Sequence, residues 1–159
     1  MNIRSILTPD RTAGSLQASS KKRAIEIIAE HIADSIPGLE TGVIYRRLIE
    51  REKLRSTAIG SGVALPHSRL PDCDSIVGGL FVFDEPIDFS AYDDMPVQII
   101  FTLLVPETET DEHLAALAML AERFEQSAFR QKLLDAASNE DLYELAISMD
   151  DADSQAVAR

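Results

Sequence analysis

Two nearly continuous apolar runs restrict the fold of this chain more than any other feature. They cover residues 76–83 and 97–105, and both are rich in β-branched and aromatic side chains. A strand with so little alternation is typical of a sheet that is covered on both faces. The sequence therefore predicts an α/β protein, with a central mixed β-sheet flanked by helices on both faces.

Apolar residues that recur at spacings of three and four predict helices on either side of the two strand runs. A first helix is expected to begin after a cap at Ser20 and to end near Ser35, where a Pro-Gly pair follows. The apolar stripe of a second helix, residues 43–49, leaves Arg47 and Arg51 one turn apart on another face. The second helix is therefore expected to present Arg47 and Arg51 together on a face that does not pack in the core.

Three more helices are predicted in the last third of the chain. Thr110 is expected to cap the third helix. The apolar face of that helix is formed by Leu114, Leu117, Ala121 and Phe124. A short fourth helix follows at about residues 129–134, and Ser138 with Asp141 opens the last helix as a weaker form of the capping box.

The length of 159 residues fits one domain, predicted at residues 1–150, with residues 151–159 as a disordered tail. The longest stretches without a charge, 56–68 and 95–106, fall far short of the ~18 apolar residues that cross a bilayer, so no membrane insertion is expected. The first residues lack the apolar core of a secretory signal, and a single cysteine cannot form an internal disulfide. We therefore expect a cytoplasmic protein.

The net charge is −12, which argues against non-specific binding to nucleic acid or to an anionic membrane. Residues 1–106 carry a net −3 and residues 107–159 a net −9, yet residues 46–69 are locally +4. The basic residues of this island are Arg46, Arg47, Arg51, Lys53, Arg55 and Arg69. Such a cluster is either a solvated helix face or part of an anion site.

The segment at residues 57–68 is the most unusual in the chain. Gly60 and Gly62, on either side of Ser61, allow backbone N–H groups to turn toward an anion, and we predict a phosphate-binding loop there. Pro66 restricts the backbone just before His67, which points to a positioned imidazole. The segment lacks the Lys-Ser or Lys-Thr of a P-loop and the third glycine of a dinucleotide fingerprint, so nucleotide binding is disfavoured.

The chain has three histidines. His31 lies inside the first predicted helix and receives no role. His113 lies in the first turn of the third, where it is either a plain capping residue or part of a site with His67.

Three short segments of the chain carry a resemblance to a known family. Arg51-Glu-Lys-Leu54, then Ser56-Thr57, then residues 60–67 ending in Pro-His, resemble the phosphorylation-site region of one class of bacterial proteins. These are the enzyme IIA domains of the fructose/mannitol class of the phosphoenolpyruvate phosphotransferase system. The resemblance covers about residues 6–148 and is greatest to the stand-alone, regulatory nitrogen-class IIA proteins.

The resemblance implies a role for three residues. His67 corresponds to the phosphoryl acceptor of the family, while Arg51 and His113 match its two supporting site residues. We expect Arg51 to clamp the phosphoryl oxygens with its planar guanidinium and His113 to hydrogen-bond the phosphoryl group or His67. Neutral imidazole accepts a phosphoryl group without a metal or a cofactor, so neither is expected.

The family also implies partners. The expected donor is a phosphohistidine carrier protein of the phosphotransferase system. The output is expected to be regulation of targets in nitrogen metabolism and potassium homeostasis, such as potassium transporters or sensor kinases, by phosphorylation-dependent binding. The protein is then a phosphocarrier with a mainly regulatory role. The alternative is a sugar-transport IIA that passes phosphate to a IIB.

Three other readings of the residues are weaker. A zinc site at His67 and His113 lacks further ligands at suitable spacing. A hydrolase with His67 as general base lacks a recognised serine nucleophile motif. Cys73, between Asp72 and Asp74, is a poor nucleophile because neighbouring carboxylates raise a thiol pKa, so it is expected to be a loop residue.

Overall fold

Six strands form one mixed sheet in the computed structural model, which describes residues 1–108 and 111–157, with side chains up to residue 150. The strands are β1 (Thr12–Leu16), β2 (Ala58–Gly60), β3 (Val63–Ala64), β4 (His67–Arg69), β5 (Val77–Ile87) and β6 (Val97–Val105). Their order is β1-β5-β6-β3-β2, and β4 also pairs with β6. β5 runs antiparallel to β6, whereas β3 and β4 run parallel to it. The mixed sheet that the apolar runs predict is confirmed.

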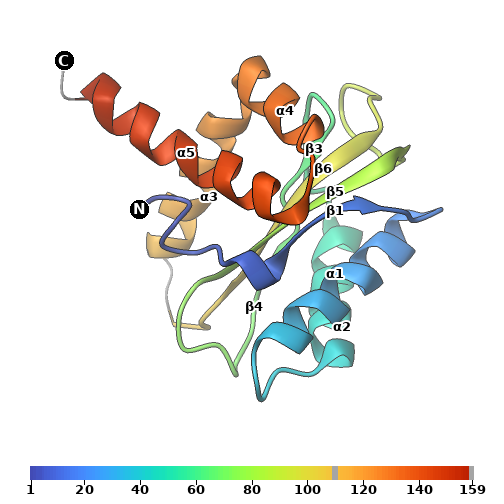
Figure 1. The fold of residues 1–159 in the computed structure, drawn as a ribbon. Coiled ribbons are helices and arrows are strands. Elements are labelled where there is room, and N and C mark those ends of the chain that lie inside the picture. The colour runs from blue at the N-terminus through green and yellow to red at the C-terminus, as the bar shows by residue number, and fades with distance from the viewer. Residues whose placement is uncertain (109–110, 158–159) are drawn as a thin grey trace.

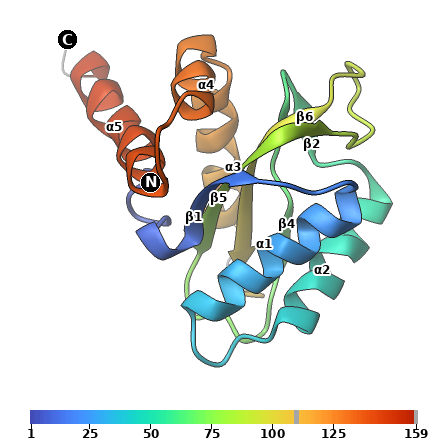
Figure 2. The same ribbon diagram turned by 45° about the vertical axis from the view of Figure 1, so that its right-hand side comes forward.

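Helices cover both faces of this sheet (Figures 1 and 2). The helices are α1 (Lys21–Ser35), α2 (Thr41–Leu54), α3 (Asp111–Phe124), α4 (Ser127–Leu134) and α5 (Asn139–Val157), with a 3-10 turn, η1, at Pro9–Arg11. α1 and α2 lie on one side, and α3, α4 and α5 lie on the other. The predicted arrangement of helices on both faces of a single domain is therefore confirmed.

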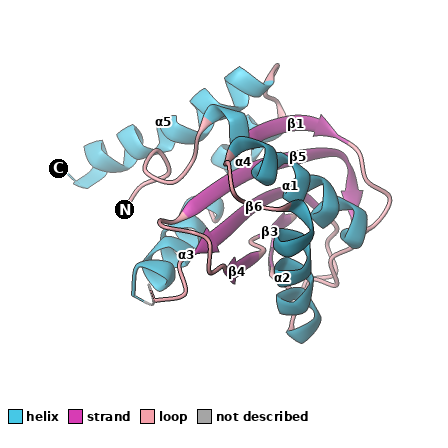
Figure 3. Ribbon diagram, turned by 90° about the horizontal axis from the view of Figure 1, so that it is seen from below, coloured by secondary structure: helices cyan, strands magenta, loops and turns pink. Residues whose placement is uncertain are grey.

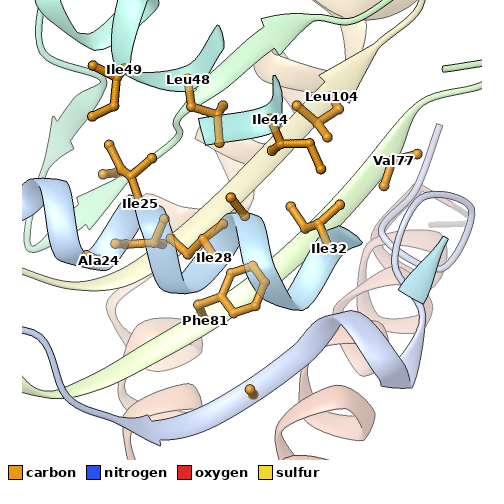
Figure 4. Packing of buried hydrophobic residues seen from close by; sticks show 14 of the residues in the cluster. Ala24, Ile25, Ile28, Ile32, Ile44, Leu48, Ile49, Val77, Phe81 and Leu104 are labelled. Atoms are coloured by element: carbon orange, nitrogen blue, oxygen red, sulfur yellow. The ribbon is translucent and has the colours of Figure 1, made fainter. Parts of the chain in front are cut away.

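Two apolar cores, one on each face, hold the layers together. Under α1 and α2, Ile28 and Ile32 pack with Phe81 of β5 and Leu104 of β6, all of them buried (Figure 4). On the opposite face, Phe101 of β6 packs in the core formed with α3, α4 and α5. Alternate residues of β5 and β6 therefore enter opposite cores, which explains why both strands are apolar throughout.

The capping predictions can be compared residue by residue. Ser20 is the N-cap of α1, and its side chain accepts a hydrogen bond from the Arg23 N–H at 3.2 Å. At the start of α5, the Asp141 N–H donates to the Ser138 hydroxyl at 3.0 Å, while the Asp141 carboxylate accepts from the Ala137 N–H at 2.9 Å. Both caps are confirmed. The third, at Thr110, lies outside the described residues.

The apolar face predicted for the third helix is wrong at Leu114 and right at Phe124, and Leu117 is partly buried against the core. Leu114 is 62% exposed, and the buried apolar residues of α3 are Ala116, Met119, Leu120 and Phe124. In this alanine-rich helix several stripes are apolar, so the sequence does not single out the one that packs. Leu114, which was expected in the core, therefore lies on the surface, next to His113 in the sequence.

A carboxylate at the end of α5 holds the start of the chain. Asp150 is 4% exposed and accepts hydrogen bonds from the backbone N–H groups of Ile3 and Arg4, both at 2.9 Å. α5 continues to Val157, beyond the predicted boundary at residue 150. The side chains of residues 151–159 lie outside the description, so the predicted disordered tail stays a prediction. Across the described helices, none has both the length and the apolar character to cross a membrane.

Candidate functional site

His67, Arg51 and His113 line one pocket of about 350 Å³. The other lining residues are Arg47, Glu50, Leu54, Ser68 and Arg69. His67 begins β4, Arg51 lies in the last turn of α2, and His113 lies in the first turn of α3. Figure 3 shows β4 between α2 and α3, which is how three distant parts of the sequence meet. The structure thus brings together the three residues that the sequence singles out.

The His67 ring is held through one of its two nitrogens. Nδ1 lies 2.7 Å from the carbonyl oxygen of Leu65. A carbonyl oxygen can only accept, so Nδ1 must donate its proton to it. In the neutral ring, Nε2 then carries the lone pair. The sequence does not settle which ring nitrogen carries the proton, whereas this contact places the proton on Nδ1 and leaves the lone pair on Nε2.

The backbone around His67 is fixed by hydrogen bonds on both sides. The Leu65 N–H donates to the Thr57 carbonyl at 2.9 Å, and the Pro66 carbonyl accepts from the Leu103 N–H at 3.0 Å. Pro66 has no N–H of its own, and it falls at the break between β3 and β4, both of which pair with β6. These hydrogen bonds hold the backbone just before His67, where the sequence predicts that Pro66 restricts it.

His113 packs against His67. The ring centroids are 5.4 Å apart with the planes at 63°, an edge-to-face arrangement. Nε2 of His113 is buried, and no hydrogen-bond partner for it is found among the described residues. A buried polar atom without a partner is costly, so it is available to a group that enters the pocket.

The surroundings of both site histidines lower their pKa and so favour the neutral rings. Burial lowers the pKa of His67, and the charge of Arg51 lowers it further, whereas the hydrogen bond to Leu65 and the charge of Glu52 act in the opposite direction. Burial also lowers the pKa of His113, with further contributions from His67 and Arg69. Neutral His67 keeps the Nε2 lone pair, which a phosphoryl acceptor needs.

The basic island divides into two groups. Arg47, Arg51 and Arg69 line the pocket, whereas Arg46, Lys53 and Arg55 do not. Arg51 donates from Nη1 to the Arg55 carbonyl at 2.7 Å, which holds the guanidinium beside the end of α2. Arg47 and Arg69 are site residues that sequence reasoning places only within the island. The helical spacing of Arg47 and Arg51 was the available signal for the first of them.

The glycine turn does not belong to this pocket. Gly60, Ser61 and Gly62 form the turn between β2 and β3, with φ of 96°, 57° and 79°. The Ser61 N–H donates to the Asp93 carboxylate at 2.9 Å. Along β6, Val63 is level with Ile99 and His67 with Leu103, so about 13 Å of strand separates the turn's end of β3 from His67.

The predicted phosphate-binding loop therefore lies outside the pocket of His67. The left-handed backbone at Gly60 and Gly62 serves a tight hairpin, and a carboxylate occupies the amide that a phosphate would need. These three residues are not part of the candidate site.

The remaining candidates of the sequence lie elsewhere. His31 packs on Phe81, with centroids 5.6 Å apart. Cys73 is buried in a turn, and burial with Asp72 and Asp74 raises the pKa of its thiol to about 11, so the thiolate is disfavoured. In the described part of the chain, no cluster of three or more His, Cys, Asp or Glu side chains could hold a metal ion.

Comparison with known proteins gives a family match over nearly the whole chain. Residues 5–148 match the family described as the phosphoenolpyruvate-dependent sugar phosphotransferase system, EIIA 2. This range contains His67, Arg51 and His113.

Relatives and solved structures agree with this match. A nitrogen regulatory protein of Pseudomonas aeruginosa is 38% identical over 149 residues, which are 94% of this chain and 97% of that protein. The crystal structure of nitrogen regulatory protein IIA-Ntr from Neisseria meningitidis is 35% identical, has a TM-score of 0.84, and covers 91% of this chain and 98% of its own. The mannitol IIA of Escherichia coli shares the fold at 19% identity and a TM-score of 0.73, over 88% of this chain and 98% of its own.

Proposed function

The chain belongs to the EIIA type 2 family of the phosphoenolpyruvate-dependent sugar phosphotransferase system, and we propose that Nε2 of His67 is its phosphoryl acceptor. The observation that carries the proposal is the Nδ1 contact of His67 with the Leu65 carbonyl, because it leaves the lone pair at Nε2. The nitrogen regulatory proteins among its relatives support a phosphorelay regulator.

The transfer step needs one bond to form and one to break. The Nε2 lone pair attacks the phosphorus, and the N–P bond to the imidazole of the donor breaks. The donor ring leaves with that electron pair. Nδ1 of His67 keeps its proton, and the Leu65 carbonyl stabilises the positive charge that develops on the ring.

Arg51 and His113 support this step electrostatically. During transfer, negative charge spreads over the phosphoryl oxygens, and positioned donors stabilise it. The guanidinium of Arg51 can hold two oxygens at once. His113, with its unpartnered Nε2 at the start of a helix, supplies a hydrogen bond close to the positive end of the helix dipole.

The donor we propose is a phosphohistidine carrier protein of the phosphotransferase system, in the cytoplasm. The output is binding of regulatory targets, such as potassium transporters or sensor kinases, that differs between the free and phosphorylated forms. Phosphorylation adds about two negative charges at the ring of His67. The surface around the pocket therefore differs in charge between the free and the phosphorylated protein, and a target can distinguish the two forms.

The test mixes the protein with phosphoenolpyruvate, the first phosphotransferase enzyme and the carrier, followed by mass spectrometry. We expect one acid-labile phosphoryl group on the wild type and on the control His31→Gln, and none on His67→Gln. A phosphoryl group that persists on His67→Gln would refute the acceptor assignment. Onward transfer to a cysteine of a sugar-specific IIB would favour the transport alternative.

A further inference from the structure

We propose that Glu52 is a positioning residue for His67, acting through Thr57 and the carbonyl of Leu65. Its effect on transfer rests on the function proposed above, whereas its effect on the ring of His67 does not. Glu52 does not line the pocket, although its neighbour Arg51 does. Its charge also acts directly on His67, where it opposes the burial that lowers the pKa of that ring, and the proposed positioning is the separate effect that Thr57 carries.

The first half of the connection is a buried carboxylate that holds Thr57. Glu52 is 6% exposed. One carboxylate oxygen accepts from the Thr57 N–H at 2.8 Å, and the other accepts from the Thr57 hydroxyl at 2.5 Å. Both oxygens of Glu52 therefore hold a single residue, which fixes the backbone of Thr57 and the orientation of its carbonyl.

The second half runs from Thr57 to the reactive ring. The Thr57 carbonyl accepts from the Leu65 N–H at 2.9 Å, and the Leu65 carbonyl accepts from Nδ1 of His67 at 2.7 Å. In Thr57 and in Leu65 the N–H and the C=O belong to adjacent peptide planes that meet at one Cα, so holding the N–H restrains the C=O through two backbone dihedral angles. A shift at Thr57 therefore moves the carbonyl that selects the tautomer of His67.

The burial of a charge at this position requires compensation. An ionised carboxylate is costly to bury unless it is paired and hydrogen-bonded. Lys21 provides a cation at 3.7 Å and also lies over the ring of Phe89. A neutral side chain would connect α2 to the following loop without the free-energy cost of burying a charge. The carboxylate adds two short charge-assisted bonds, and these restrict Thr57 more tightly.

Two pairs of variants test the proposal. Thr57→Val removes the hydroxyl donor and keeps the shape, whereas Thr57→Ser restores the hydroxyl. Glu52→Gln removes the charge with the same size, and Glu30→Gln on the exposed side of α1 is the matched charge control. The first readout is the tautomer of His67 in the unphosphorylated protein, from ring-nitrogen NMR shifts. The second is the transfer rate from the phosphorylated carrier.

We expect Thr57→Val and Glu52→Gln to raise the population of the Nε2–H tautomer of His67. We also expect about a tenfold lower maximal transfer rate, with the half-saturating carrier concentration unchanged. Thr57→Ser and Glu30→Gln should match the wild type in both measurements. Wild-type tautomer and rate in Glu52→Gln and Thr57→Val would overturn the proposal. If the wild type is not phosphorylated on His67, the proposed function fails, and the tautomer measurement still decides the role of Glu52.

Discussion

At the scale of single residues, the proposed role of the Arg51 guanidinium can be tested by one substitution. We expect Arg51→Lys to slow phosphoryl transfer about tenfold, because an ammonium is a point charge and cannot hold two oxygens in a fixed plane. Stopped-flow transfer from the phosphorylated carrier measures this.

The control for this substitution is Arg46→Lys, an exposed arginine of the same helix outside the pocket. Both variants should keep the wild-type free energy of unfolding to within about 1 kcal/mol. Transfer at the wild-type rate in Arg51→Lys would rule out the clamp.

The lowered pKa of His67 and His113 gives a pH dependence of stability with a definite sign. As the pH falls through ~6.5, both side chains take up protons in the unfolded chain, whereas the folded protein resists this until a lower pH. The free energy of unfolding should therefore decrease as the pH drops below ~6.5. Urea denaturation at about pH 7.5 and about pH 5.5 measures the decrease.

The double variant His67→Gln, His113→Gln isolates this contribution. It removes both groups, so it should lose less stability between the two pH values than the wild type does. An equal loss in the two proteins would assign the pH dependence to other groups.

Sequence reasoning located the side chains that meet in the pocket better than the backbone groups that hold them. His67, Arg51 and His113 carry distinctive side chains, and the family resemblance implies all three. The Leu65 carbonyl and the Thr57 carbonyl belong to the backbone, so no residue type marks them. Glycines mark backbone freedom, and at Gly60 that freedom is used for a hairpin turn rather than for an anion.

At the scale of elements, the cap of α1 gives a prediction independent of function. Ser20→Ala removes the acceptor for the Arg23 N–H and should lower the free energy of unfolding by about 1 kcal/mol. Chemical denaturation measures the change. Ser19→Ala is the matched control, since Ser20 is the cap of this helix; an equal loss in both variants would contradict the capping role.

The long elements were predictable because burial leaves a pattern in the sequence. β6 spans Val97–Val105 as predicted, and α1 ends at Ser35 as predicted. The short strands β1, β2 and β4 were not assigned, because three to five residues are too few for a period to stand out. β4 depends on pairing with β6, a long-range contact that local sequence does not encode.

At the scale of the whole molecule, the charges are arranged unevenly. Three arginines line the pocket of His67, while the sequence between Arg69 and Arg123 has no Lys or Arg at all. The net charge of −12, carried outside the arginine cluster, should steer a basic patch of the carrier. We expect the association rate to fall as salt rises from about 20 mM to about 200 mM, measured by stopped flow. A rate independent of salt would contradict steering alone and leave the transfer chemistry untouched.

Asp150 of α5 accepts hydrogen bonds from the backbone N–H groups of Ile3 and Arg4, and so connects the start of the chain to its last helix. Release of Ile3 and Arg4 would leave the buried carboxylate of Asp150 without these two donors, so we expect the start of the chain and this part of α5 to loosen together. Deuterium uptake at these two amides therefore gauges the docking of α5, and a fluorophore joined ahead of Ile3 would sit next to that helix.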